Sequence, residues 1–159
     1  MSSDLEVRIA EICVGNTSEI IKTNGVGSCI AIIIYDPILR IGGLAHAMLP
    51  TANGAKGVIW SNSGKGFVKY ADSAVDALVS RMESLGGVRK HFVAKLVGGA
   101  HMFTLIDGDV GIGQQNTNSA KSRLGFYGIP IDAEVTGGTV GRNVQFDCAT
   151  GIVEVITKV

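Results

Sequence analysis

The sequence predicts an α+β (mixed α/β) fold in which a mostly antiparallel or mixed β-sheet core is flanked by two main helices. Short β-branched and apolar runs recur along the chain, with glycine-rich turns between them. Only two stretches have helical character. No repeat or linker divides the 159 residues, so we expect a single domain over residues 1–159.

Composition excludes several classes of protein. Hydrophobic residues make up 46% and charged residues 18%, so the chain is not disordered. The formal net charge of zero argues against nucleic-acid binding. The longest apolar runs are far shorter than the ~20 residues of a membrane-spanning helix, and no signal peptide is visible. Three widely spaced cysteines without a CxxC motif predict no disulfide framework, no metal site and a cytoplasmic location.

The first half of the chain predicts four strands. Residues 7–14 alternate in polarity, with a slip near Ala10 that suggests a bulge. Residues 19–23 form a second short apolar segment, and residues 29–35 and 41–49 form two longer ones. Asp36 and Pro37 have the order that a type I turn prefers, so the last two strands form a hairpin.

The second half predicts both helices and the remaining strands. Residues 51–68 indicate a long exposed loop. Apolar residues at helical spacing predict a helix from Tyr70 to Leu85, which Gly86 ends. A second helix is expected over 117–126, with Asn116 as its N-cap. Further strands are expected at residues 91–97, 131–135, 143–146 and 152–157.

Hairpin geometry suggests a site. If Asp36 lies opposite Leu39, then Cys29 lies directly opposite His46 on the same face of the sheet. A thiol beside an imidazole can form a thiolate–imidazolium pair, in which the cation lowers the cysteine pKa. We therefore expect the sulfur and an imidazole nitrogen to lie within hydrogen-bond reach or slightly beyond it.

The residues before Cys29 fit a nucleophile site. The hydroxyl of Thr23 is a candidate to orient His46, as the third group of a triad does. Gly25, Gly27 and Ser28 form a loop whose backbone N–H groups are candidates to approach a substrate and stabilise an oxyanion. The alternative is that Cys29 is inert packing and Thr23 an ordinary strand residue. Structural roles are expected for Cys13, Cys148, His91 and His101.

The segment Thr23-Asn24-Gly25-Val26-Gly27-Ser28-Cys29 resembles the T-x-G-x-G-S-C motif of the CheD family of chemoreceptor glutamine deamidases. The likeness continues, in the family's order, through Asp36-Pro37, residues 43–50, residues 69–72, Gly98-Gly99-Ala100 with Met102-Phe103, Ile112-Gly113 with Asn116, and Thr136-Gly137-Gly138 with Arg142. Two features depart from the family pattern. Residues 51–68 are longer than usual, and Gln115 stands where arginine is common.

The resemblance implies a function. Cys29, His46 and Thr23 match the catalytic set of the family, which hydrolyses receptor glutamine side chains to glutamate and releases ammonia through a thioester. It implies helical chemoreceptor signalling domains and a CheC-type phosphatase as partners, and no cofactor.

Two other functions compete with this one. A non-catalytic adaptor would bind receptors or the phosphatase through the same cleft, but it has no physical need for a thiol near a histidine. A thiol redox protein is disfavoured because no second cysteine is close in sequence to Cys29.

Overall fold

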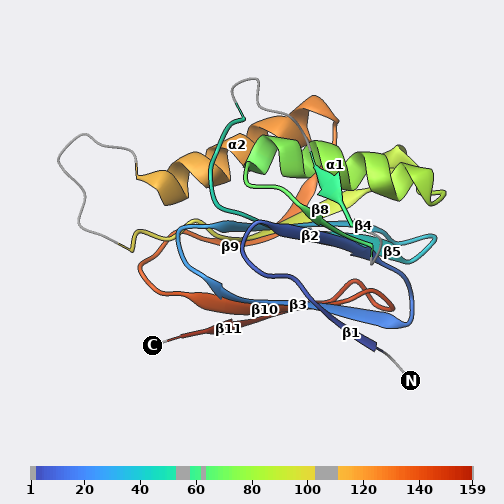
Figure 1. The fold of residues 1–159 in the computed structure, drawn as a ribbon, viewed down its shortest axis with the longest axis horizontal. Helices are drawn as coiled ribbons and strands as arrows, with labels where there is room; N and C mark the ends of the chain where they lie inside the picture. The colour runs from blue at the N-terminus through green and yellow to red at the C-terminus, as the bar shows by residue number, and fades with distance from the viewer. Residues whose placement is uncertain (1–2, 53–57, 62–63, 103–110, 159) are drawn as a thin grey trace.

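A computed structural model describes residues 3–52, 58–61, 64–102 and 111–158. The described chain forms three layers, in which two helices cover one face of a large sheet and a smaller sheet packs against the other face (Figure 1). Two helices and two mixed sheets confirm the predicted α+β class.

The larger sheet has seven strands in the order β6-β7-β2-β5-β4-β8-β9. All neighbours in it are antiparallel except β8 and β9, which are parallel. In chain order the strands are β2 (Glu11–Gly15), β4 (Ile30–Asp36), β5 (Ile41–Ala47), β6 (Ile59–Trp60), β7 (Lys65–Phe67), β8 (Val93–Gly98) and β9 (Ile131–Thr136).

The smaller sheet joins segments that are far apart in the chain. Its order is β1-β3-β10-β11, with bounds Ser3–Glu6, Glu19–Val26, Arg142–Asp147 and Val153–Thr157. β1 is parallel to β3, whereas β10 is antiparallel to both β3 and β11.

β4 lies at the centre of the core, and all seven of its residues are buried. Ile30, Ile32 and Ile34 belong to the apolar cluster beneath the helices. Ala31 and Ile33 belong to the cluster between the two sheets. An uninterrupted β-branched run fits a strand that is covered on both faces.

The prediction of one strand over residues 7–14 is wrong in part. Residues 11–14 lie in β2, whereas residues 7–10 belong to no strand and connect β2 to β1, which lies in the other sheet. Ala10 has a φ of 66°, and this left-handed residue turns the chain from one sheet into the other. The slip in alternation near Ala10 therefore marks a corner and not a bulge.

The loop predicted over residues 51–68 is wrong in part, because β6 and β7 lie inside it. Residues 53–57 and 62–63 lie outside the described part of the chain.

The predicted hairpin forms, but its register differs from the prediction by two residues. Asp36 lies opposite Ile41, and Ala31, not Cys29, lies opposite His46. Arg40 adopts a φ of 56° and donates its N–H to the Asp36 carbonyl at 2.8 Å, which lengthens the turn. A shift by two residues leaves every side chain on its predicted face.

The first helix, α1 (Ala71–Ser84), lies within one residue of its prediction at each end. The second, α2 (Ile112–Phe126), begins five residues earlier than predicted and has Gly111 as its N-cap. Asn116 is therefore a buried residue inside the helix and not its cap. A short 3₁₀ helix, Arg89–His91, precedes β8. Within the described residues, neither helix is long and apolar enough to cross a lipid bilayer.

Candidate active site

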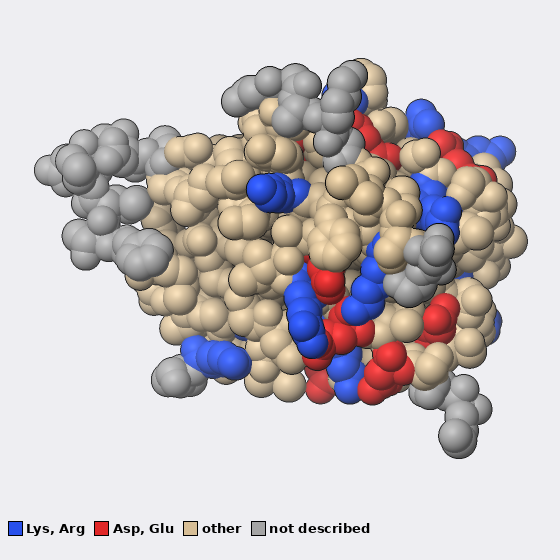
Figure 2. Space-filling model, in the orientation of Figure 1, with Lys and Arg blue, Asp and Glu red and all other residues tan. Residues whose placement is uncertain are grey.

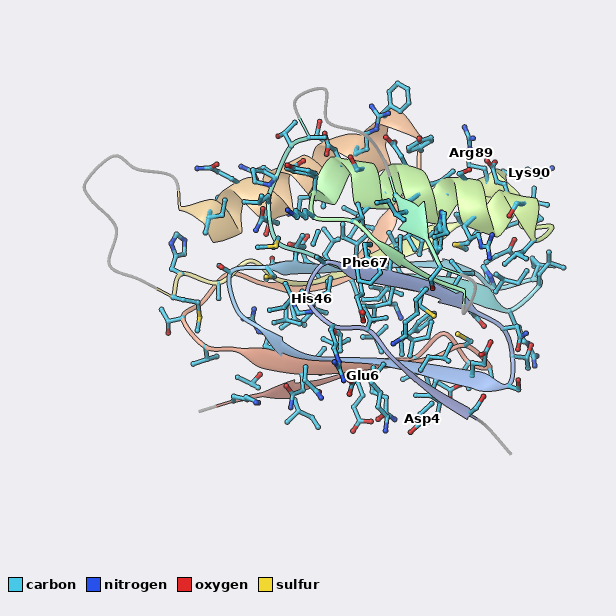
Figure 3. The ribbon with its side chains drawn as sticks, viewed as in Figure 1. Asp4, Glu6, His46, Phe67, Arg89 and Lys90 are labelled. Atoms are coloured by element: carbon cyan, nitrogen blue, oxygen red, sulfur yellow. The ribbon has the colours of Figure 1, made fainter. Side chains whose placement is uncertain are left out.

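Thr23 and His46 meet between the two sheets. Thr23 belongs to β3 in the smaller sheet, and His46, which is labelled in Figure 3, belongs to β5 in the larger one. Both residues are fully buried, and Thr23 Oγ1 lies 2.7 Å from His46 Nδ1 in a hydrogen bond. A hydroxyl is a neutral partner, so this contact orients the imidazole without adding a charge to it.

Cys29 lies immediately before β4 and is partly buried against the cluster between the sheets. His46 lies opposite Ala31 in the β4–β5 ladder, and Cys29 is two residues before Ala31. His46 Nε2 is buried and forms no hydrogen bond with any described residue, Cys29 included. The second imidazole nitrogen is therefore available for a proton.

The predicted thiolate–imidazolium pair is not the resting state of these residues. Burial lowers the pKa of His46 to about 4, so its imidazole is neutral at pH 7. Burial also raises the pKa of the Cys29 thiol above its ordinary value, although a backbone hydrogen bond partly opposes this. The expected lowering of the Cys29 pKa is therefore wrong, because desolvation dominates and His46 carries no charge that could offset it.

The loop before Cys29 changes direction at Gly25, whose φ is 67°. Its N–H donates to Asn143 Oδ1 of β10 at 3.0 Å, so this N–H is already engaged. A side chain at Gly27 would come within 3.2 Å of Met102 Cγ, and glycine therefore lets the loop pass close to Met102.

Three successive carbonyls of this loop are hydrogen-bonded to other elements. Those of Gly27 and Cys29 accept the N–H groups of Ala100 and Gly99, at 2.9 and 2.7 Å. The Ser28 carbonyl accepts the Asn116 amide at 2.9 Å. In a planar trans peptide the N–H points away from the preceding C=O. The N–H groups of Ser28 and Cys29 are therefore directed away from these partners. Neither donates to the backbone of a described residue, and the N–H of Cys29 lies against its own sulfur, which lowers the pKa of the thiol slightly.

Sequence reasoning gave no structural role to Arg142, which supports the same loop from behind. Its buried guanidinium donates to the carbonyls of Gly98 and Gly137 at 3.2 and 2.8 Å. A side chain at Gly98 would collide with the Cys29 carbonyl. The resemblance to CheD proteins included both residues, and that was the one signal in the sequence that pointed to them.

Among the described residues, no hydrogen bond joins the remaining cysteines and histidines to Thr23 or His46. Cys13 is opposite Leu44, and burial raises its pKa to about 11. Cys148 follows β10, and burial raises its pKa to about 12. His91 lies in the 3₁₀ helix, and the backbone N–H of His101 donates to Gly138. Among residues 3–52, 58–61, 64–102 and 111–158, no three His, Cys, Asp or Glu side chains are grouped so that they could hold a metal ion.

A cysteine near a buried histidine whose imidazole is held by a hydroxyl has the groups of a nucleophilic hydrolase. Comparison with known proteins identifies the family. The family described as CheD chemotactic sensory transduction matches residues 48–157, a span that begins two residues after His46. The chain belongs to the CheD family.

Similarity to individual CheD proteins covers nearly the whole chain. A Clostridium novyi protein named probable chemoreceptor glutamine deamidase CheD is 42% identical over 97% of this chain and 93% of its own length. An Archaeoglobus fulgidus protein of the same name is 43% identical over 92% of this chain and 88% of its own. The Halalkalibacterium halodurans chemoreceptor glutamine deamidase CheD is 36% identical over 94% of this chain and 91% of its own.

Proposed function

We propose that this chain is a chemoreceptor glutamine deamidase in which Cys29 is the nucleophile, His46 the general base and acid, and Thr23 the residue that orients His46. The observation that carries the proposal is the similarity, over nearly the full chain, to relatives named as deamidases. The contact between Thr23 and His46 supports it, because a buried histidine held at one nitrogen leaves the other for proton transfer.

The reaction begins from a neutral thiol and a neutral imidazole. His46 Nε2 takes the proton of the Cys29 thiol as the sulfur attacks the carboxamide carbon of a glutamine side chain, forming a C–S bond and an oxyanion. The imidazolium then returns this proton to the amide nitrogen, the C–N bond breaks, and ammonia leaves. A water molecule that loses a proton to His46 attacks the thioester carbon. The C–S bond then breaks, the imidazolium returns the proton to the sulfur, and glutamate and the free thiol are released.

The contact with Thr23 is compatible with the tautomer that this cycle needs. If His46 donates its Nδ1–H to Thr23 Oγ1, the lone pair stays on Nε2, where the proton must be accepted. Because no carboxylate of the described residues stabilises the imidazolium, it exists only during the transfer, in agreement with a His46 pKa of about 4.

The oxyanion is proposed to bind the N–H groups of Ser28 and Cys29, which the anchored carbonyls direct away from α2 and β8. The role expected for the N–H of Gly25 is replaced by a structural one, because it donates to Asn143. Gly27 has no side chain, and this lets the loop that carries these N–H groups pass beside Met102.

The proposed substrates are glutamine side chains of chemoreceptor signalling domains, as the names of the relatives state for those proteins. We propose the cytoplasm as the site of action, where free cysteines such as the three of this chain stay reduced. The partnership with a CheC-type phosphatase stays a prediction from the resemblance.

Mass spectrometry of a receptor fragment tests the proposal. Chemoreceptor cytoplasmic fragments from the source organism are incubated with the wild-type protein and with the Cys29→Ala and Cys13→Ala variants. We expect wild type and Cys13→Ala to convert glutamine to glutamate. We expect Cys29→Ala to be inactive, because no other cysteine lies in the segment Gly25–Cys29 that precedes β4.

Circular dichroism shows whether each variant is folded. Substantial activity in folded Cys29→Ala would contradict the covalent mechanism. A receptor that binds the wild-type protein but keeps all its glutamines would favour the adaptor.

A further inference from the structure

Asn116 is a polar residue at a position where α2 otherwise buries small or apolar side chains. Its side chain is completely buried, and its Oδ1 atom forms no hydrogen bond with a described residue. Burying an amide costs free energy unless its hydrogen bonds compensate. The role of Asn116 therefore depends on the bonds that its Nδ2 atom makes.

Nδ2 donates to two backbone carbonyls on neighbouring segments. One is Ser28 at 2.9 Å, the residue before Cys29, and the other is Met48 at 3.2 Å, two residues after His46. The last pair of the β4–β5 ladder is Ile30 with Ala47. Asn116 therefore joins the two segments just beyond the point where their ladder ends.

Close packing holds Asn116 in this place. A side chain at Gly113, one turn earlier in α2, would collide with the backbone of Gly99 and Ala100. Thr117, the next residue, packs against Gly99 and donates to the carbonyl of Gly113 at 3.0 Å. The helix is thus seated on the segment whose N–H groups hold the carbonyls of Gly27 and Cys29, and the amide of Asn116 completes this set of contacts.

We propose that Asn116 is a positioning residue that fixes the orientation of the peptide unit between Ser28 and Cys29. This proposal rests on the proposed function. Since the Ser28 carbonyl and the Cys29 N–H belong to one rigid plane, a bond to the carbonyl also aims the N–H. Without Asn116 that plane can rotate, and the Cys29 N–H no longer points at the oxyanion of the tetrahedral intermediate.

Two reactions of Cys29 separate this role from a general effect on the site. Deamidation passes through an oxyanion, whereas alkylation by iodoacetamide is a direct displacement that forms none. We expect Asn116→Ala to lower kcat for receptor deamidation by at least ~10-fold, since loss of one oxyanion donor costs about 10²–10³-fold. We expect KM to stay within about twofold of wild type, since Asn116 does not contact the substrate. We expect the rate of Cys29 alkylation to fall much less than kcat, since the Cys29 N–H affects the thiol pKa less than burial does.

Two further variants complete the design. Asn118→Ala removes the same side chain from an exposed position of α2, where it bonds to Gln114, and we expect wild-type rates. Asn116→Ser keeps one donor, and we expect partial recovery of kcat relative to Asn116→Ala.

The outcomes discriminate between the explanations. Wild-type kcat in Asn116→Ala, or a parallel loss of alkylation and deamidation, would overturn the positioning role alone. Unfolding of both Asn116 variants would overturn it too, because the residue would then serve the fold. Failure of the wild-type protein to deamidate any receptor would overturn the proposed function, and this inference with it.

Discussion

His46 is enclosed by protein on every side, and only its Nδ1 atom has a hydrogen-bond partner among the described residues. Water therefore cannot solvate a positive charge on this side chain. Desolvation is the cause of its low pKa, which falls to about 4. The hydrogen bond with Thr23 therefore orients the imidazole, and protonation of the imidazole destabilises the folded protein.

This burial predicts an acid-sensitive fold. The unfolded chain binds a proton at His46 with a pKa near 6.5, whereas the folded chain binds it only near pH 4. The contribution of neutral His46 is thus complete above about pH 6.5 and is lost as the pH falls toward about 4. Urea unfolding near pH 7.5 and near pH 4.5 should differ by about 2–3 kcal/mol from this residue.

His46→Gln removes the titrating group and provides the comparison. We expect the pH-dependent loss of stability to shrink by that amount in the variant. An equal loss in both proteins would show that another group causes it.

At the scale of elements, β5 is packed on both faces, because helices cover one face and the smaller sheet covers the other. Gly42 faces the ring of Phe146 from β10, and Gly43 faces Leu78 from α1. Neither position has room for a methyl group. These glycines let two layers approach the strand that carries His46.

Gly42→Ala should therefore destabilise the protein. The added methyl group would collide with Phe146 and also lie 3.0 Å from a carbon of Tyr35, so the sheets must separate. We expect a loss of about 1–3 kcal/mol in the free energy of unfolding, measured in urea.

Gly125→Ala is the matched control, since the same change occurs where no atom lies within 4 Å, in an exposed turn of α2. Here alanine should stabilise by about 0.5–1 kcal/mol, because it favours the helix. Similar effects at both sites would contradict the packing argument.

The sequence predicted elements well where one local pattern decided them. The apolar spacing of α1 and the β-branched run of β4 are such patterns. The hairpin register was missed because it depends on the φ of Arg40, a residue type that gives no signal for that conformation. The face shared by Cys29 and His46 was still predictable, because the error was an even number of residues.

Only the residue types of the site could be predicted from the sequence. Cys29, His46 and Thr23 are apparent as residue types, but burial sets the pKa values of the first two, and burial is a property of the assembled layers. Asn116 was assigned to a helix cap because asparagine favours that place. Its two carbonyl partners lie 88 and 68 residues away in the chain, beyond the reach of any local pattern.

On the scale of the whole molecule, opposite charges are paired at one end. Figure 2 shows acidic and basic side chains intermixed over the region of β1 and β2, where Asp4 binds Lys22 and Glu11 binds Lys65. The part of this face nearer the start of α2 carries few charged side chains (Figures 1 and 2). On this face the charged side chains are therefore gathered on one part of the surface.

The layered architecture predicts a gradient of local stability. β4 is hydrogen-bonded on both edges and buried on both faces, whereas β9 and β11 are edge strands with mostly exposed residues. We expect hydrogen exchange, followed by mass spectrometry, to be slowest in β4 and faster in the two edge strands. Equal protection of β11 and β4 would contradict this order.

The hydrogen bond between Thr23 and His46 also has a consequence for the order of events during synthesis. Thr23 pairs with Val144 of β10, so the layer that carries it gains its inner strand only after residues 142–147 have left the ribosome. Cys29 is synthesised more than a hundred residues before β10, and His46 about a hundred residues before it. A nascent chain therefore carries the thiol and the imidazole while the strand of the hydroxyl that orients the imidazole still lacks its partner β10. The layer that holds Thr23 against His46 is therefore completed only after β10 has been synthesised.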